Sequence, residues 1–187
     1  MGSYAVFLRG INVGGINIKM ADLREALKNH GFPDAKTLLA SGNVVLASTL
    51  DAAAVKQECE KCLRAAFGYD AWVVVLDAER VAQLVEACPY PDDDKSTHSY
   101  ITLSSSTAVL DELEAAGSAL ANHDQQRLGP EALAWLAPAG GTLDSPFSKI
   151  SAKAKFKAAT TTRNLRTMIK VRDAAASLAA GRQATDP

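Results

Sequence analysis

The sequence predicts a mixed α+β fold made of two successive units. Short apolar runs rich in strand-forming residues alternate with segments whose apolar residues recur every three or four positions, a pattern typical of strands and amphipathic helices. Glycine or proline marks most of the boundaries between them. Residues 89–96 combine two prolines with three consecutive aspartates, so this stretch is expected to link the units.

In the first unit, residues 1–90, the elements follow the order βαββαβ. The strands are expected over four apolar runs: 4–9, 36–40, 44–47 and 72–76. One helix carries apolar residues at steps of three and four and ends at Gly31: Ile16, Met20, Leu23 and Leu27. The other begins after Asp51, a residue suited to the N-cap, and ends at Gly68. This order is that of a ferredoxin-like unit.

The second unit, residues 96–187, repeats part of that order. Strands are expected over 100–103, 125–128 and 132–136, with a helix between the first two that carries Val109, Leu113 and Leu120. Two basic helical segments follow, over 147–158 and 162–180. The resulting βαββα order predicts a related, truncated ferredoxin-like unit. No sequence repeat accompanies it, so the duplication rests on element order alone.

Topology predicts that two loops far apart in sequence meet at one edge of the first sheet. The first strand of a ferredoxin-like sheet is antiparallel to the third, so the end of one lies beside the start of the other. An arginine, a glycine-rich loop and the start of the first helix then lie near the Ser41-Gly42-Asn43 turn, and together they are suited to an anion. The candidate ligand-binding residues of this edge are Arg9, Gly10, Asn12, Gly14, Gly15, Ser41 and Asn43.

A structural interpretation of the same glycines stays open, because they also permit the positive φ angles of tight turns. The spacing of Gly10, Gly14 and Gly15 fits neither a Walker A loop nor a dinucleotide-binding fingerprint. The placement of the loop is therefore more informative than its pattern.

The end of the chain is basic although the net charge is −1, with eight lysines and arginines between positions 149 and 172 and no acidic residue among them. On the helix expected over 162–180, Arg163, Arg166 and Lys170 form one stripe directly after three threonines. Such a stripe can dock phosphates, and hydroxyls at a helix start can hold an anion. The alternative is a solvated outer face. Arg163, Asn164 and Arg166 join the candidate ligand-binding residues.

Several of these motifs resemble one known family. Arg9-Gly10-Ile11-Asn12-Val13-Gly14-Gly15, Met20-Ala21-Asp22-Leu23-Arg24 and Ser41-Gly42-Asn43-Val44-Val45 are similar to the opening of the family of domains of unknown function numbered 1697 (DUF1697). The segment 159–167 resembles its C-terminal signature, with Leu165 where the family usually carries Trp. The resemblance spans essentially the whole chain. It implies a ferredoxin-like first half and a related second half, and no established reaction.

Other reactive side chains are given structural interpretations. Cys59 and Cys62 form a CxxC in mid-helix with both sulfurs near the apolar face, which favours core packing. The three histidines are isolated, and the run Asp92-Asp93-Asp94 lacks the spacing of a calcium loop. The sequence therefore predicts no metal site and no cofactor, and it identifies no catalytic residue.

Composition indicates a cytoplasmic protein. The 48% hydrophobic and 22% charged residues exclude wholesale disorder, and three cysteines are too few for a disulfide framework. The first residues do not form a signal peptide, and no apolar run approaches the roughly 20 residues that cross a bilayer.

Three kinds of function stay open. The favoured one is a binding module for a phosphate-bearing ligand, either a nucleotide-like small molecule or a nucleic-acid backbone. An enzyme acting on a small anionic metabolite is the second, although no motif places a general base. A protein-interaction module is the third. Recognition of RNA by base stacking is disfavoured, because residues 44–47 offer no aromatic side chain.

Overall fold

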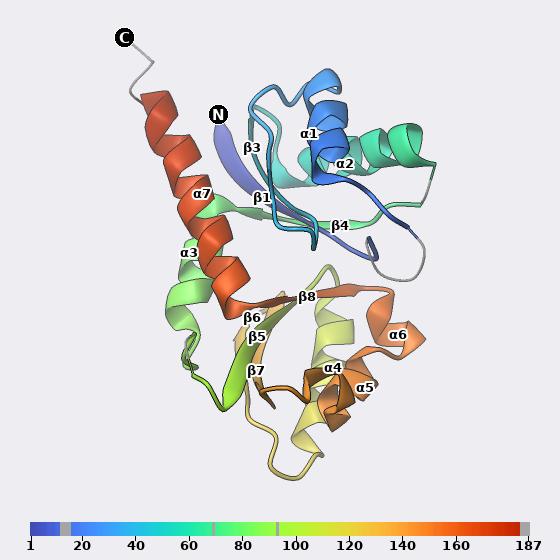
Figure 1. Ribbon diagram of the computed structural model, residues 1–187, viewed down its shortest axis with the longest axis vertical. Helices are drawn as coiled ribbons and strands as arrows, with labels where there is room; N and C mark the ends of the chain where they lie inside the picture. The colour runs from blue at the N-terminus through green and yellow to red at the C-terminus, as the bar shows by residue number, and fades with distance from the viewer. Residues whose placement is uncertain (12–15, 69, 93, 184–187) are drawn as a thin grey trace. The chain divides into compact units, whose positions relative to one another are not determined.

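The computed structural model describes residues 1–11, 16–68, 70–92 and 94–183. It is a mixed α+β fold with two four-stranded antiparallel sheets and, within the described residues, seven α-helices (Figure 1). The chain divides into two compact units, one of Met1–Ala82 together with Ile169–Pro187, the other of Gln83–Met168. These bounds differ from the expected division at residues 90–96, because the last part of the chain groups with the first unit.

The first unit contains the elements that its sequence predicts. They are β1 (Gly2–Leu8), α1 (Met20–Asn29), β2 (Lys36–Leu38), β3 (Asn43–Ser48), α2 (Ala52–Phe67) and β4 (Val73–Asp77). The strand order is β2-β3-β1-β4, and β1 runs antiparallel to both of its neighbours. Two predicted helix boundaries are confirmed. Asp51 caps α2 by accepting a hydrogen bond from the amide of Ala54 at 2.8 Å, and Gly68 ends α2 with φ +64°.

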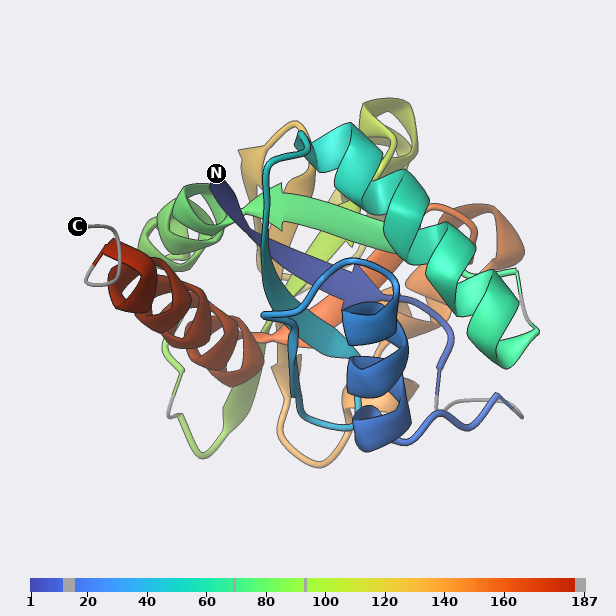
Figure 2. The ribbon, with the colours of Figure 1, turned by 90° about the horizontal axis from the view of Figure 1, so that it is seen from above.

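The core of the first unit lies between its sheet and α1 and α2. Alternate residues of the central strands point to this side, which is the two-residue period of a strand. They pack against Leu23 and Leu27 of α1 and against an apolar face of α2 that includes Cys59 and Cys62. Figure 2 shows α1 and α2 over the same face of the sheet. The core interpretation of both cysteines is confirmed, since each thiol is buried.

The second unit repeats this topology. Its elements are β5 (Thr97–Ser104), α4 (Thr107–Ser118), β6 (Gln125–Gly129), β7 (Ala132–Pro138), the 3₁₀ turn η1 (Thr142–Asp144), α5 (Pro146–Ser151), α6 (Ala154–Lys157) and β8 (Thr160–Asn164). The strand order is β6-β7-β5-β8. Phe147 and Phe156 anchor α5 and α6 in a core that also contains Trp135. Helix α3 (Ala78–Ala87) ends in this unit and α7 (Leu165–Gln183) begins in it, and each has its other part in the first unit.

The expectation of a truncated second unit is wrong. Residues 162–164 do not begin a helix, because Thr160–Asn164 forms β8, which pairs antiparallel with β5 from Ser104↔Thr160 to Tyr100↔Asn164. Three consecutive β-branched threonines favour a strand, and β5 would be a buried edge strand without this partner. The hydroxyls of Thr102 and Thr162, 2.9 Å apart, link the two strands. The last helix begins only at Leu165.

No helix within the described residues has both the length and the apolar character needed to cross a membrane.

Candidate functional site

The two loops expected at one edge of the first sheet do meet. Phe7 of β1 pairs with Asn43 of β3, and the amide of Leu8 donates to the carbonyl of Gly42 at 2.8 Å. Arg9 therefore follows β1 directly beside the turn that contains Ser41. Asn12, Gly14 and Gly15 lie outside the described residues. The topological prediction is confirmed for the described part of this edge.

The turn at residues 39–42 is held by its own polar groups. Nδ2 of Asn43, which is fully buried, donates to the carbonyl of Leu38 at 2.9 Å and to Oγ of Ser41 at 3.0 Å. Gly42 has φ +75°, and a Cβ on it would lie 2.4 Å from Cδ1 of Ile11. A larger residue at position 42 would displace that side chain. Ser41, Gly42 and Asn43 thus serve the turn and its packing, as the structural interpretation requires.

The start of the first helix differs from the expectation. The apolar pattern places Ile16 in this helix, whereas α1 begins at Met20 and no side chain caps it. The α1 N-terminus therefore begins five residues after the glycine-rich loop ends, and Gly10 is exposed with φ +70°. Of the two positively charged features expected at this edge, the helix N-terminus therefore lies further along the chain, and Arg9 directly follows β1.

Arg9 packs on the ring of Trp72, a residue that is not among the candidates predicted from the sequence. Its guanidinium carbon lies 5.8 Å from the ring centroid of Trp72, and its amide donates to the carbonyl of Trp72 at 3.2 Å. Nζ of Lys56 lies 4.9 Å from the same centroid and pairs with Glu60. Burial lowers the pKa of Arg9. The ring of Trp72 thus contacts two cations, which the face of an indole favours.

Arg163 is a residue of β8 and is buried, so the predicted stripe of Arg163, Arg166 and Lys170 on one helix is wrong. Nη1 of Arg163 donates to Oγ1 of Thr161 at 2.7 Å and to the carbonyl of Thr162 at 2.9 Å. Burial lowers its pKa to about 10. Nη1 of this enclosed guanidinium is thus directed at β8 itself.

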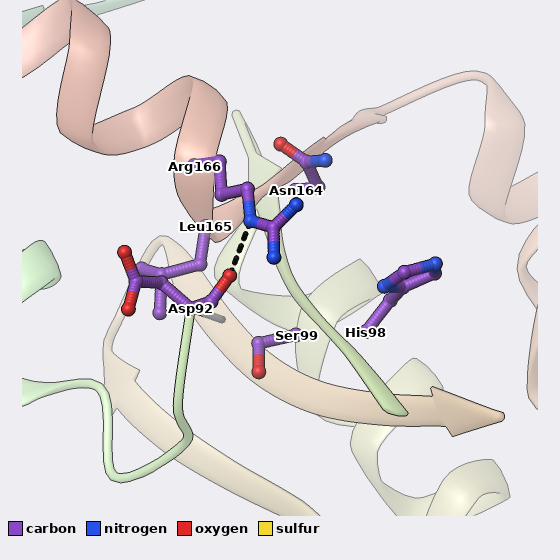
Figure 3. Close-up of a pocket in the computed structure, with 6 residues that line it drawn as sticks. All are labelled: Asp92, His98, Ser99, Asn164, Leu165 and Arg166. Atoms are coloured by element: carbon purple, nitrogen blue, oxygen red, sulfur yellow. Dashed lines mark hydrogen bonds between the residues drawn. The ribbon is translucent and has the colours of Figure 1, made fainter. Parts of the chain in front are cut away.

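Asn164 and Arg166 line a pocket of the second unit. The pocket, called here the α7 pocket, holds about 250 Å³ of empty space, part of it open to solvent (Figure 3). The residues that line it come from the segment before β5, from β5 itself and from the junction of β8 with α7: Asp92, His98, Ser99, Asn164, Leu165 and Arg166. The antiparallel pairing of β5 with β8 brings these segments together, because Tyr100 faces Asn164.

Asn164 is the N-cap of α7. Its Oδ1 accepts a hydrogen bond from the amide of Thr167 at 2.8 Å, which fixes the side-chain amide at the mouth of the helix. The cap uses only the acceptor Oδ1 of this side chain, so the two N–H donors of Nδ2 take no part in the cap. Leu165 is buried behind the pocket, so it holds this junction in place and is not available for stacking.

The guanidinium of Arg166 is fixed through its Nε, while its two terminal nitrogens face the pocket. Its Nε donates to the backbone carbonyl of Asp92 at 2.5 Å. Figure 3 shows the two terminal nitrogens of Arg166 extending into the space between Asn164, Ser99 and His98, with the carboxylate of Asp92 turned away from His98. Neither terminal nitrogen has a hydrogen-bond partner within the described part of the chain.

Asn164 and Arg166 are among the residues predicted from the sequence, whereas His98 and Ser99 are not. Ser99 is buried, and its Oγ donates to the carbonyl of Pro91 at 2.5 Å, so it shapes the wall. His98 is half-buried. The run of three threonines could have revealed this site: once Thr160–Asn164 is taken as a strand antiparallel to β5, Asn164 lies beside Tyr100 and close to His98.

The α7 pocket therefore offers several donors at one helix N-terminus. A guanidinium, a carboxamide and an imidazole surround the space, and the first turn of α7 adds backbone N–H groups and a partial positive charge. No group of three metal-ligating side chains occurs among the residues that the structure describes. The arrangement is suited to holding an anion.

Comparisons with known proteins find a similar fold in another protein and a matching family, and neither of them carries a known activity. The structure is similar to that of the conserved bacterial protein SP0830 from Streptococcus pneumoniae, with a TM-score of 0.76 and 22% sequence identity over 93% of this chain and 98% of that chain. A search of curated proteins found no match. Residues 1–133 match the family described as "Protein of unknown function (DUF1697)". The chain therefore belongs to the DUF1697 family.

Proposed function

We propose that this protein is a binding module for a phosphate-bearing ligand, and that the second unit holds the phosphate in the α7 pocket. The observation that carries the proposal is the pair of terminal Arg166 nitrogens directed into a space also lined by Asn164 and His98. Guanidinium groups bind phosphate oxygens through two parallel N–H donors, which gives strong and geometrically defined contacts. Of the ten candidate ligand-binding residues, Asn164 and Arg166 carry this proposal.

The position of the pocket at the start of α7 supports the same ligand. This helix has 19 residues, and its first N–H groups have no partner within the helix itself. The Asn164 cap satisfies the amide of Thr167, and the earlier amides of α7, those of Leu165 and Arg166, are the ones left to face an incoming anion. The helix dipole adds favourable electrostatic energy at this end, about 0.3–1 kcal/mol for a surface anion.

Thermal unfolding in the presence of two probes tests this proposal. Inorganic phosphate and adenosine monophosphate are added at constant ionic strength, with potassium chloride as the blank. A ligand at 100 times its Kd adds about 2.7 kcal/mol, which for a chain of this size raises Tm by about 5–10 °C. The variant R166A is expected to lose at least tenfold in affinity for either probe.

The control variant is R172A. Arg172 lies on the same helix but pairs with Asp173 at 2.8 Å, so its removal takes away one positive charge without touching the pocket. The proposal fails if neither probe shifts Tm, or if R166A and R172A weaken binding equally. Binding that survives R166A but is lost in R9A would assign the ligand to the first-unit edge instead.

We further infer that both units are ferredoxin-like. Two observations support this assignment. The strand orders β2-β3-β1-β4 and β6-β7-β5-β8 correspond position by position, and each first strand is central and antiparallel to its two neighbours. In both units helical elements connect the first strand to the second and the third to the fourth, which gives a βαββαβ order.

A further inference from the structure

We propose that the surface of α5 and α6 binds the phosphate backbone of double-stranded nucleic acid without reading its sequence. Four exposed lysines form this lysine surface: Lys149, Lys153, Lys155 and Lys157. It belongs to the second unit but is separate from the α7 pocket, since none of its residues lines that pocket. The proposal is thus independent of the small-ligand function.

The lysines carry charge that the protein itself barely neutralises. Lys155 pairs with Glu112 at 2.9 Å, but both side chains are more than 60% exposed, and such surface pairs contribute little. Within the described residues the other three lysines make no ion pair. Lys153 and Lys157 are four positions apart across α6, where like charges repel. The fold therefore keeps an unfavourable charge arrangement that an external anion would relieve.

The lysine surface is held on a rigid support. Phe147 of α5 and Phe156 of α6 are each 1% exposed and pack into the core that contains Trp135. Ser145 caps α5 by accepting from the amide of Ser148 at 3.2 Å. Because the buried phenylalanines fix the backbone, the lysines are displayed in a preset pattern and less order must be imposed when a partner binds.

The net charge of −1 for the whole chain does not oppose this binding. The Debye length is about 10 Å at 0.1 M salt, so charges beyond that distance are screened and the local field decides. The nearest acidic residue before the lysines in sequence is Asp144, and the next after them is Asp173. A segment of 28 residues between these two therefore contains only basic charges, and the acidic group that pairs with one of the four lysines in space is Glu112, beside Lys155.

The composition of the lysine surface selects nucleic acid among polyanions. Insertion into a membrane requires large exposed apolar side chains. The large apolar residues of this segment, Phe147, Ile150 and Phe156, are buried or half-buried, and the exposed large hydrophobics of the described chain are Met1, Leu39 and Leu50. Lysine is depleted at protein–protein interfaces, where aromatic residues and arginine provide the anchors. The phosphates of a nucleic-acid backbone, by contrast, can be bound by lysine charges without aromatic or arginine anchors.

A duplex is favoured over a single strand for a related reason. Proteins that bind single strands place exposed aromatic rings under the bases. The two aromatic residues among the lysines are Phe147 and Phe156, and both are buried. A duplex also presents the higher charge density, about one phosphate per 1.7 Å of axis, and so releases more counterions.

Fluorescence anisotropy with a labelled 20-base-pair DNA duplex tests the proposal between 20 and 100 mM potassium chloride. Four phosphate contacts predict a slope of about −3.6 in log K against log salt, or a loss of about 300-fold across this range. The triple variant K149Q/K153Q/K157Q is expected to reduce the slope to about −0.9 and the loss to about fourfold.

The matched control is K19Q/K28Q/K36Q, which removes the same charge from exposed positions of the first unit. The expected result is that this control keeps the wild-type slope. Equal effects of both triple variants, or a wild-type slope near zero, would refute the lysine surface. Tighter binding to a single strand of the same length, or binding to phosphatidylserine vesicles in place of DNA, would overturn the choice of partner. Each triple variant changes only exposed side chains, and circular dichroism verifies its fold.

Discussion

Replacing Gly117 by alanine is expected to destabilise the second unit, although alanine is the better helix former. Gly117 lies one residue before the end of α4. A Cβ on it would lie 2.1 Å from Oε1 of Gln125 and 2.7 Å from Cε2 of Phe147. Neither neighbour moves freely, because Nε2 of Gln125 donates to the carbonyl of Glu114 at 2.7 Å and to Oγ of Ser118 at 2.8 Å, while Phe147 is 1% exposed.

The size of the effect follows from three opposing contributions. Helix propensity favours alanine by up to about 1 kcal/mol, and by less near a helix end. Overpacking against a buried ring costs about 1–3 kcal/mol. If Gln125 is pushed aside, its two hydrogen bonds are lost at about 1 kcal/mol each. The net expectation is a loss in the free energy of unfolding of about 0–3 kcal/mol if Gln125 stays in place, and of about 2–5 kcal/mol if it is displaced.

Urea unfolding followed by tryptophan fluorescence measures this loss, since Trp135 packs against Phe147 with ring centroids 4.8 Å apart. The control is G181A, because Gly181 lies two residues before the end of α7 and its Cβ would have no neighbour within 4 Å. That variant is expected to gain up to about 1 kcal/mol. If G117A proves as stable as G181A, the steric argument is refuted.

Three further predictions concern single side chains. The variant N43D places an acceptor where Nδ2 now donates to Leu38 and Ser41, so the free energy of unfolding should fall by at least about 2 kcal/mol. The variant S41A removes only one of these contacts and should cost about 1 kcal/mol or less. Comparable urea midpoints for the two variants would argue against a turn-holding role for Asn43. The variant L39N should raise the free energy of unfolding by about 0.5–1 kcal/mol, as measured by thermal unfolding, because Leu39 has φ +58° and asparagine tolerates this region. The variant L50N, at a similarly exposed leucine, should show no such gain. A gain in both variants would point to side-chain exposure, not to backbone strain. Burial raises the pKa of Cys59 to about 12 from a model-peptide value of 9.0, so the stability that its neutral thiol contributes is complete below pH 9 and is lost as the pH rises toward 12. Peptide mapping after iodoacetamide treatment at pH 8 should therefore show Cys88 modified well before Cys59, and equal labelling would contradict this account.

The sequence alone predicted the first unit well because its local features agree with its tertiary structure. Asp51 and Gly68 mark the ends of α2, and the Ser41-Gly42-Asn43 turn marks the start of β3, so each boundary has a chemical cause in the sequence. The start of α1 was harder to locate, since Ile16 continues the apolar period of the helix although the helix begins only at Met20. Periodicity reports which face is buried, and residues beside a helix can share that face.

The second unit shows where local patterns are insufficient. The basic residues and the apolar positions of α7 suggested that the helix starts at 162, whereas Thr160–Asn164 is a strand because β5 provides a partner 60 residues earlier in the sequence. The α7 pocket depends on that pairing. Asn164 and Arg166 could be named from their chemistry, but His98 could be joined to them only through the register of β5 and β8.

The grouping of residues 169–187 with Met1–Ala82 has a consequence for biosynthesis. The ribosome synthesises Met1–Ala82 first, yet this unit lacks residues 169–187 until more than 80 further residues have been made. At about 5–20 residues per second, the delay is about 4–17 s. The unit of Gln83–Met168 is continuous in sequence, so during translation the second unit is complete before the first.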